Sequence, residues 1–450
     1  MRATTLLSRL FSINSTRVRG FEFADDGLVC DVEPTTRVAV CGGCMKPCRK
    51  VHDRRPPREW RHLDLAGVRT ALRYAPRRVE CDACGVTTEL VPWATPRSWF
   101  TEIFEQMTAY LAQQCNRTAV AEVMRLSWNT VGPIIERVVA RVLPGDRLDG
   151  LTHIGIDELS YRKHHKYVTI VIDHLTGRVV WAREGKSADT LIEFFVELGI
   201  ERANKLEVVS IDMSPAYIDA VRTMAPHVEL VFDRFHVQKL AQEALDELRR
   251  AEVREAPDTA ARKELKGTRW ALQKRPWNLH AMERSRVSGV QRTNRRLYRG
   301  YLIKETLAAI LDGRQQHVAR GKLQEWISWA THSGLKPFVR VGKTIAKHID
   351  GIVAYVATGI SNGRSEGTNG KVRTITRRAY GFHAADSLIA MLHLCYSGIR
   401  LRPPVAVPSF HQTLWTAEYC GRERARRSGA GCARLDGSAE RTSARPATSL

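Results

Sequence analysis

The stretch His153-Ile154-Gly155-Ile156-Asp157-Glu158 decides the fold of this 450-residue chain. Its apolar run ends in an acid, and two further strand-like runs follow at 166–173 and 178–184. An aspartate at the exit of a buried strand is held at a sheet edge, where a metal ion can reach it. The same aspartate could merely cap the strand, so the rest of the chain must decide between the two interpretations.

The residues that follow predict an α/β domain. An amphipathic helical pattern at 187–198 precedes a fourth apolar run at 206–212, and a helix at 215–224 precedes a fifth run at 228–232. This succession predicts a mixed five-stranded sheet, because the first three strands return through hairpins and the later ones follow helical crossovers.

Strand direction sorts the carboxylates of this sheet. The second strand returns antiparallel to the first, so Asp173 falls at the opposite edge, in a turn. The fourth strand follows a crossover and runs parallel to the first, which places Asp212 at the same edge as Asp157. Asp233 follows the fifth strand at that edge too, and direction alone does not dismiss it.

Two aspartates at one edge suit two-metal chemistry, in which hard oxygen ligands hold Mg²⁺ (or Mn²⁺) ions. A third carboxylate is normally needed, and the chain first becomes helical in four stretches at 239–255, 268–273, 297–311 and 323–331. Four tryptophans lie there, and their spacing favours core positions over nucleotide stacking; they are Trp270, Trp277, Trp326 and Trp329.

A further helix is predicted to begin at Glu366. One face of this helix carries Glu366, Asn369, Arg373 and Arg377. A carboxylate in line with arginines suits a site that holds metal and phosphodiester together. A glutamate at a helix N-terminus also favours the helix dipole without any catalytic role.

Two Cys-x-x-Cys pairs lie near the N-terminus. Cys41 and Cys44 form one pair and Cys81 and Cys84 the other, which is the spacing of a tetrahedral structural Zn²⁺ site. Cys48 lies between the pairs and is more often a bystander. The intervening arginine-rich segment completes a zinc-ribbon-like module with a basic surface, although such arginines also occur on merely solvated faces.

Residues 101–143 have the rhythm of a helix-turn-helix, with a short helix, a tight turn at 126–130 and a longer helix that carries Pro133 in its first turn. Any three-helix unit has similar spacing. If the motif binds DNA, the exposed candidates for base or phosphate contact are Trp128, Asn129, Thr130 and Arg137.

The charge of the chain favours a polyanionic partner. Lysine and arginine outnumber aspartate and glutamate by 70 to 48, a formal charge of +22. We find no transmembrane run, and Met1 to Thr16 lacks a signal-peptide core and indicates a short amphipathic element. Clustered cysteines argue against a secreted disulfide framework and favour a reducing cytoplasm.

Four motifs carry a family resemblance, and they are Gly155 to Glu158, Ser210 to Tyr217, Phe232 to Val237 and Asn362 to Gly381. In this order and spacing they resemble the transposases of the ISL-three family of bacterial insertion sequences, over roughly residues 1–400. Ser361 to Ser365 departs from the threonine-asparagine and apolar residue expected before the acid, and leaves Glu366 in place.

The resemblance implies a DDE transposase with an RNase H-like core that a helical insertion interrupts before the last acid. By motif, Asp157, Asp212 and Glu366 match the three catalytic, metal-binding acids. Asp233 and His236 match a family motif near the site, and we interpret them as supporting residues.

The expected organisation is a zinc-binding module (1–95), a helix-turn-helix domain (96–146), a catalytic domain (147–400, insertion about 240–355) and a basic, disordered tail (401–450). The expected function is DNA cleavage and strand transfer at the terminal inverted repeats, with double-stranded element ends and target DNA as substrates. We expect a homo-oligomer on DNA that makes no membrane contact and is associated with the bacterial nucleoid. The alternatives are a domesticated DNA-binding regulator without catalysis and a related metal-dependent nuclease.

Overall fold

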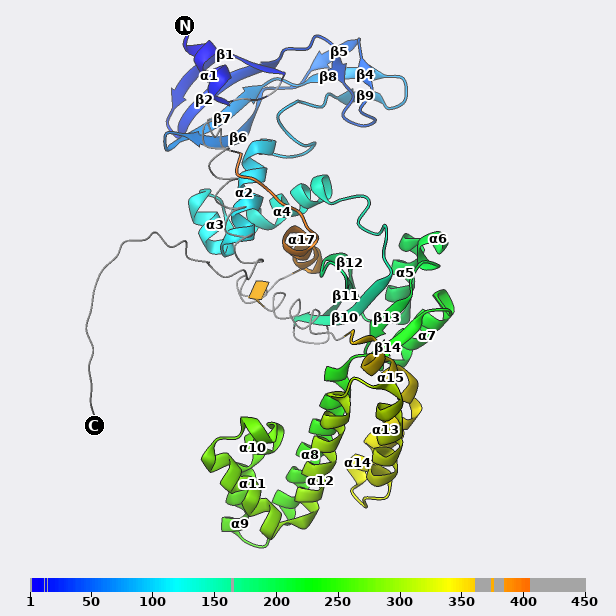
Figure 1. Cartoon of the computed structure of the whole chain (residues 1–450). Helices are drawn as coiled ribbons and strands as arrows, with labels where there is room; N and C mark the ends of the chain where they lie inside the picture. Colours follow the sequence, from blue (N-terminus) through cyan, green and yellow to red (C-terminus); the bar gives the residue numbers. More distant parts are fainter. Residues whose placement is uncertain are drawn as a thin grey trace, which may run out of the picture. The chain divides into compact units, whose positions relative to one another are not determined.

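The structure is a computed structural model that describes residues 2–11, 13, 15–162, 166–360, 374–375 and 384–404 (Figure 1). Glu366, Asn369, Arg373 and Arg377 lie outside these residues, as does the predicted tail beyond residue 404. Within the described ranges, no helix combines the length and the apolar character that a membrane span requires.

The N-terminal residues form a helix and a four-stranded sheet. The order of the strands is β1-β2-β7-β6, with β2 and β7 parallel and the other pairs antiparallel. The amphipathic α1 packs Leu7 and Phe11 into the same core as Trp60 and Leu72, which explains the pattern predicted for the first residues. The elements are α1 (Ala3–Phe11), β1 (Thr16–Ala24), β2 (Gly27–Pro34), β6 (Arg58–Leu65) and β7 (Val68–Tyr74).

Short strands surround the cysteines. A two-stranded ladder joins β3 to β4, and β8 pairs with both β5 and β9 in a three-stranded sheet. Each Cys-x-x-Cys pair lies in a tight turn at the end of one of these strands. The strands are β3 (Ala39–Val40), β4 (Pro47–Cys48), β5 (Val51–Arg54), β8 (Arg77–Cys81) and β9 (Gly85–Thr88).

Three helices follow, namely α2 (Glu102–Gln114), α3 (Arg117–Val123) and α4 (Trp128–Val142). Thr101 and Asn116 cap α2 and α3 through side-chain hydrogen bonds to Phe104 N and Ala119 N. The helix after the turn begins at Trp128, so the prediction that Pro133 lies in its first turn is wrong. Pro133 lies inside α4, and its missing N–H leaves the carbonyl of Asn129 without the usual helical donor.

The predicted mixed five-stranded sheet is confirmed, with the order β12-β11-β10-β13-β14. Strands β11 and β12 are antiparallel to their neighbours, whereas β10, β13 and β14 run parallel. Helices α5, α6 and α7 make the crossovers. The elements are β10 (His153–Arg162), β11 (Lys166–Asp173), β12 (Val179–Glu184), α5 (Ala188–Leu198), α6 (Ile200–Ala203), β13 (Val208–Ile211), α7 (Pro215–Met224) and β14 (Glu229–Phe232).

The prediction that the first strand ends at Asp157 is wrong in one respect. β10 continues to Arg162, because β11 remains paired with it as far as Lys166 in an extended hairpin. Its parallel pairing with β13 does end earlier, at Gly155 opposite Ser210. Asp157 therefore lies beyond the end of the parallel part of the sheet while its own strand continues.

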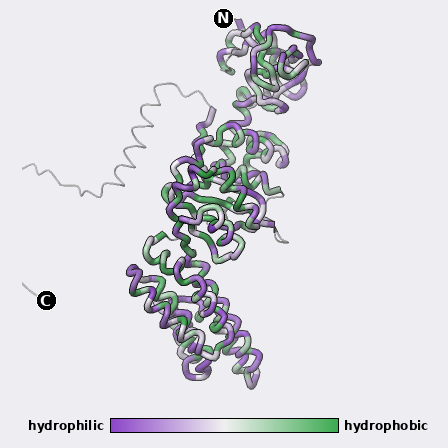
Figure 2. The backbone as a smooth tube through the Cα atoms, turned by 90° about the vertical axis from the view of Figure 1, so that its right-hand side faces the viewer, coloured by the Kyte–Doolittle hydropathy of each residue, from purple (hydrophilic) through white to green (hydrophobic). Residues whose placement is uncertain are grey.

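The insertion after β14 is helical throughout its described length. Hydrophobic and hydrophilic segments alternate along these helices (Figure 2), and their buried faces share one core with the sheet. The elements are α8 (Arg234–Glu255), α9 (Thr259–Gly267), α10 (Arg269–Gln273), the 3-10 helix η1 (Pro276–Asn278), α11 (Ala281–Thr293), α12 (Arg295–Leu311), α13 (Gln316–Thr331), α14 (Lys336–Lys347) and α15 (Ile349–Thr358).

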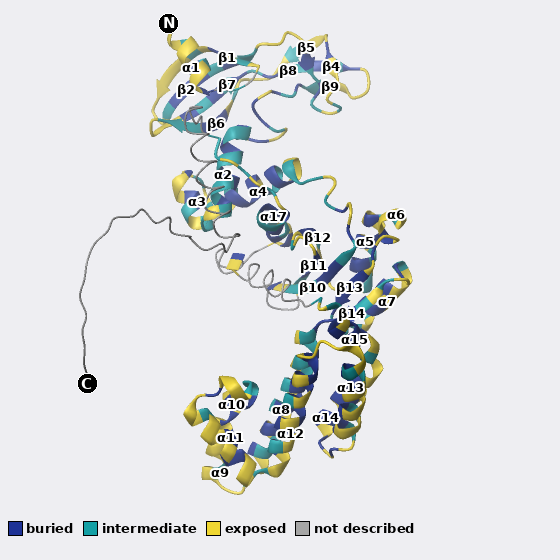
Figure 3. Cartoon of the chain, viewed as in Figure 1, coloured by how far each residue is buried: buried dark blue, intermediate teal, exposed yellow. Residues whose placement is uncertain are grey.

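The prediction that the four tryptophans of this insertion are core residues holds for one of them. Trp326 is buried, and its indole N–H donates to Ile303 O at 2.8 Å. Trp270, Trp277 and Trp329 are exposed by 65%, 68% and 37%. The many exposed residues of α9 to α11 are visible in Figure 3. Helical spacing did not distinguish these positions because packing partners, not the period, decide which face is covered.

Candidate functional site

Three aspartates follow one row of paired residues in the sheet. Gly155 on β10 pairs with Ser210 on β13, and Ser210 pairs with Val231 on β14. Two residues beyond this row come Asp157, Asp212 and Asp233. Neighbouring parallel strands lie about 4.8 Å apart, so the register brings three carboxylates to one edge.

Backbone N–H groups hold the first two carboxylates in place. Glu158 N donates to Asp157 Oδ1 at 2.7 Å, and Ser214 N donates to Asp212 Oδ1 at 2.9 Å. Both aspartates are half-buried, so a ligand can approach them from solvent. The opposite-edge prediction for Asp173 is confirmed, because its carboxylate accepts from Leu175 N in the turn after β11.

Asp233 is the most buried of the three, with its side chain turned toward the start of α8. It caps this helix by accepting from Phe235 N at 3.1 Å, and its Oδ2 lies 3.1 Å from Nδ1 of His236 in an ion-pair contact. Asp233, with smaller effects from Asp157 and Asp212, raises the pKa of His236, because the carboxylates favour the imidazolium. All three acids therefore act electrostatically on one imidazole.

A fourth carboxylate and a tyrosine, to which the sequence assigned no role, complete this cluster. Burial and the neighbouring charge of Asp212 raise the pKa of Glu158. Burial also raises the pKa of Tyr217, whose hydroxyl bonds to Glu158 and lies 2.8 Å from Thr169 Oγ1. Both residues stand inside the motifs around Asp157 and Asp212, so their closeness in sequence to the acids was the available signal.

Close packing fixes the backbone just before Asp157. His174 Nε2 lies 2.7 Å from Ser210 Oγ, across the position where Gly155 has no side chain. A Cβ at Gly155 would lie only 2.7 Å from that same nitrogen. A side chain at this position would therefore displace His174 or push apart the strands that carry the acids.

The four predicted zinc ligands come together in the structure. The Sγ atoms of Cys41, Cys44, Cys81 and Cys84 all lie within 4.8 Å of one another. Cys48 does not belong to this group and is buried beside it. Four thiolates at these separations fit a tetrahedral metal ion, and the chemistry of the donors favours zinc.

The turns around the cysteines favour thiolates. Backbone N–H groups of Ala83 and Cys84 lower the pKa of Cys81 to about 6, and those of Cys44 and Gly43 lower the pKa of Cys41. Hydrogen bonds to the sulfur atoms of Cys44 and Cys41, then burial and the repulsion from these two thiolates, raise the pKa of Cys84 to about 12. A divalent cation removes that repulsion.

The helix-turn-helix candidates have different surroundings. Asn129 is exposed in the first turn of α4, where recognition helices reach base edges. Trp128 lies under Arg117, whose Cζ is 3.8 Å from the ring centroid, and the Thr130 hydroxyl lies 2.6 Å from that of Ser127. Both side chains therefore make contacts with residues of the same helix-turn-helix.

The side chain of Arg137 is less exposed than predicted for a DNA contact, because it pairs with a buried carboxylate. Its Nε lies 2.7 Å from Oε1 of Glu105, a carboxylate whose side chain is fully buried. Ser98 Oγ donates to the same carboxylate at 2.8 Å. Arg137 therefore ties α4 to α2, because a buried charge needs a partner more than a surface charge does.

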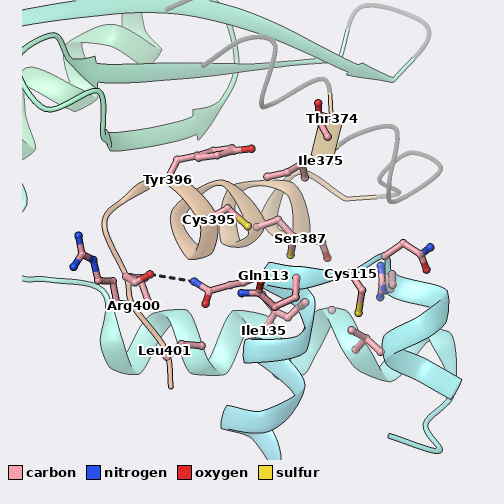
Figure 4. A pocket seen from close by; sticks show the side chains of 18 residues that line it. Gln113, Cys115, Ile135, Thr374, Ile375, Ser387, Cys395, Tyr396, Arg400 and Leu401 are labelled. Atoms are coloured by element: carbon pink, nitrogen blue, oxygen red, sulfur yellow. Dashed lines mark hydrogen bonds between the residues drawn. The ribbon is translucent and has the colours of Figure 1, made fainter. Parts of the chain in front are cut away.

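Helix α17 (Ala385–Tyr396) packs against the helix-turn-helix. Its Leu394 belongs to the same core as Ile134 of α4, and Gln113 of α2 donates to Leu394 O at 2.7 Å and to Ile399 O at 3.1 Å. A cavity of about 610 Å³ lies between these helices (Figure 4). Its walls come from α2, α4 and α17, together with residues 115–117, 374–375 and 399–401, which surround these packed helices.

Comparison with protein families gives three matches along the chain. A model for DDE transposases of the ISL3 type matches residues 154–392. A model for the helix-turn-helix domain of transposase family ISL3 matches residues 89–139. A zinc-finger model of the IS204/IS1001/IS1096/IS1165 transposases matches residues 37–84. Together they span the cysteine group, the three helices and the sheet with its aspartates.

Curated proteins resemble the chain over most of its length. The transposase for insertion sequence element IS1557 of Mycobacterium tuberculosis, in two strains, is 35% identical over 89% of this chain and 97% of that protein. The transposase for insertion sequence element IS1001 of Bordetella parapertussis is 28% identical over 82% of this chain and 91% of that protein.

Proposed function

The chain belongs to the ISL3 family of DDE transposases, which bind DNA, and we propose that it cuts and joins DNA at the ends of its own insertion element. The register that brings Asp157 and Asp212 to one edge of the sheet carries this proposal. Glu366, outside the described residues, is proposed as the third catalytic acid on the strength of the family motif.

The residues of the edge fit a hard divalent cation, because Asp157 and Asp212 offer half-buried carboxylate oxygens at the same edge of the sheet. We propose Mg²⁺, or Mn²⁺ in its place, held by these two residues with Glu366. When bound, the cation supplies an activated water and neutralises charge on the leaving oxygen. The fit rests on the donor chemistry and on the strand register.

The chain's own residues position the acids for this chemistry. Glu158 N and Ser214 N orient the carboxylates of Asp157 and Asp212, so little reorganisation is needed when substrate arrives. Asp233 orients His236, and in its protonated form His236 adds positive charge near a phosphodiester. We therefore assign Asp233 and His236 positioning roles. The same role is proposed for Asn369, Arg373 and Arg377, which lie outside the described residues.

The reaction divides into two in-line displacements at one site. First, a water oxygen attacks phosphorus at the element end, the bond to the 3′ oxygen breaks, and that oxygen leaves with a proton as a 3′-hydroxyl. Second, the 3′-hydroxyl attacks a phosphodiester of the target: a new P–O bond forms, the bond to the target's 3′ oxygen breaks, and the proton lost by the attacking hydroxyl is balanced by one gained on that leaving oxygen. Both steps depend on positioning and charge neutralisation.

End recognition is proposed for the N-terminal elements. The module at 1–95, held by zinc on Cys41, Cys44, Cys81 and Cys84, and the helices at 96–146 would read the terminal inverted repeats, with Asn129 the exposed candidate at the start of α4. The domain at 147–400 would carry the chemistry. Because two ends must be handled together, we propose a homo-oligomer on DNA, working at the nucleoid.

A strand-transfer assay tests the proposal. The full chain is incubated with Mg²⁺, a duplex carrying an element end and a target plasmid, and joined products are separated on a gel. We expect joined product from the wild type and from the control Asp219→Asn, whose exposed carboxylate lies on α7. Asp157→Asn should give neither cut nor joined product. Cutting without joining would indicate a nuclease, and binding without cutting a regulator.

A further inference from the structure

Much of the chain's positive charge lies in the helical insertion. Residues 234–358 contain 25 lysines and arginines against 12 aspartates and glutamates, a surplus of 13 out of the chain's 22. About half of this surplus lies at 259–293, which covers α9, α10, η1 and α11, with nine basic residues against two acidic ones. Such a concentration of one sign is the electrostatic footprint of a nucleic-acid contact.

Two tryptophans stand on this basic segment with most of their surface in solvent. Trp270 on α10 is 65% exposed and Trp277 on η1 is 68% exposed. Each ring has an arginine on it: Arg269 Cζ lies 4.9 Å from the centroid of the Trp270 ring, and Arg275 Cζ lies 4.5 Å from that of Trp277. Tryptophans are normally well buried, so two exposed rings paired with guanidinium groups call for a partner that covers them.

The backbone beneath Trp270 is firmly anchored. Ala271 and Leu272 are buried, and the buried amine of Lys304 on α12 donates to Leu272 O at 2.8 Å. Burial lowers the pKa of Lys304, and the carboxylate of Glu305 beside it opposes that effect. The short helix α10 is therefore held by the core of the insertion, and its outward ring is presented on a fixed support.

The support of Trp277 is an ion-pair network. Arg275, which lies over the Trp277 ring, is 3.3 Å from Glu305 and 2.5 Å from Asp312 through its guanidinium nitrogens. Arg234 at the start of α8 also contacts Asp312. These contacts connect the platform under Trp277 to the helix that begins immediately after Asp233, and so to the edge that carries the acids.

The chemistry of the surface distinguishes between possible partners. A second copy of the chain would bring an equally basic surface against this one, at a cost in repulsion. Duplex DNA has its base faces stacked inside the helix, so it offers phosphates to the arginines and nothing to the exposed rings. Single-stranded DNA offers both phosphates and unstacked base faces, and basic surfaces with aromatic platforms are how proteins bind it.

We propose that the surface formed by α10 and η1 binds single-stranded DNA, with bases stacked on Trp270 and Trp277 and phosphates held by the surrounding lysines and arginines. This inference rests on the proposed transposase function. The role of the surface would be to hold a DNA strand that is separated from its complement near the cut end. The surface is distinct from the strand edge of Asp157 and Asp212.

Fluorescence anisotropy with a labelled oligothymidylate of about 16 nucleotides tests this proposal on the full chain without divalent metal. Replacement by alanine at either tryptophan should weaken binding by about fivefold or more, and Trp270→Ala with Trp277→Ala by about 25-fold or more. Trp270→Phe should retain most of the affinity, because a phenyl ring still stacks. Trp329→Ala is the matched control, since Trp329 on α13 is also exposed, and should bind like wild type.

Three outcomes overturn the proposal. The first is that the wild type does not bind the oligonucleotide, and the second is that both alanine variants bind it with an affinity within about twofold of wild type. The third is that the wild type self-associates without DNA in sedimentation and the double variant does not, which would make the surface an interface between copies of the chain. Because binding is measured without catalysis, a wild type that joins element ends but does not bind oligothymidylate contradicts the proposed single-strand binding and leaves the proposed transposase function unaffected.

Discussion

Asp212 and Asp233 leave the central sheet side by side, because the residues that precede them, Ile211 and Phe232, pair across parallel strands β13 and β14. Their surroundings differ. Asp212 is half-buried and accepts a hydrogen bond from Ser214 N. Asp233 is buried, and its carboxylate accepts from Phe235 N at the start of α8 and contacts the imidazole of His236. The first carboxylate is available to a metal ion and the second supports the site, which leads to the first prediction.

Replacing Asp233 by asparagine should slow end cleavage by about 10- to 100-fold while leaving end binding unchanged, which is the usual size of effect for residues that surround the metal ligands without binding the metal. The physical reason is that the imidazole of His236 loses its charged partner but the metal ligands remain. Single-turnover cleavage, with Asp219→Asn as the control on α7, measures the effect. A loss as large as that of Asp212→Asn would make Asp233 a ligand instead.

Cys81→Ser should abolish stoichiometric zinc binding, because it removes the thiol whose pKa the backbone of Ala83 and Cys84 holds at about 6. The purified full chain should contain one zinc ion, and chelation should weaken end binding as the module unfolds. Plasma emission spectroscopy gives the metal content. Cys48→Ser is the control and should retain zinc; equal loss from both variants would contradict the ligand set.

Arg137→Ala and Asn129→Ala should separate folding from recognition. The first removes a charged hydrogen bond to the buried Glu105 and should lower the free energy of unfolding by about 1.5–3 kcal/mol. The second should leave stability nearly unchanged and weaken end binding by about 1–3 kcal/mol if Asn129 contacts a base edge. Thermal melting and a binding titration check both. Reversed effects would mean that Arg137 is the recognition residue.

Acid should destabilise the protein through two buried histidines. Burial lowers the pKa of both His62 and His393 to about 4. In the unfolded chain these histidines have a pKa near 6.5, so between these two values the unfolded state binds protons that the folded state does not bind. Stability is therefore complete above about pH 6.5 and is lost as the pH falls toward 4, by roughly 2 kcal/mol per histidine at pH 5. His393→Gln should flatten the pH dependence of urea unfolding by that amount. An unchanged pH profile would rule out its role.

The sequence predicted the edge of the acids because strand polarity follows from the connections between strands. Helical crossovers before β13 and β14 make these strands parallel to β10, and a hairpin makes β11 antiparallel, so Asp173 could be set apart from Asp212 without coordinates. The zinc ligands were predictable for a similar reason, since the spacing within each Cys-x-x-Cys pair alone brings two thiolates together.

The features that were missed depend on contacts between distant segments. Nothing local to Arg137 reveals the buried Glu105, 32 residues earlier. Trp270 and Trp326 both lie in helical patterns, and only the arrangement of helices exposes one and buries the other. Likewise, the length of β10 depends on the pairing that β11 continues beyond Asp157.

The most direct test of the central claim is single-turnover cleavage of an element-end duplex by Asp212→Asn with Mg²⁺, at a protein concentration that saturates end binding. The account predicts an affinity for the end within about twofold of wild type and a cleavage rate lower by about 100-fold or more, because a charged ligand at the reacting centre is lost. Cleavage at the wild-type rate by a variant that is fully bound would contradict it.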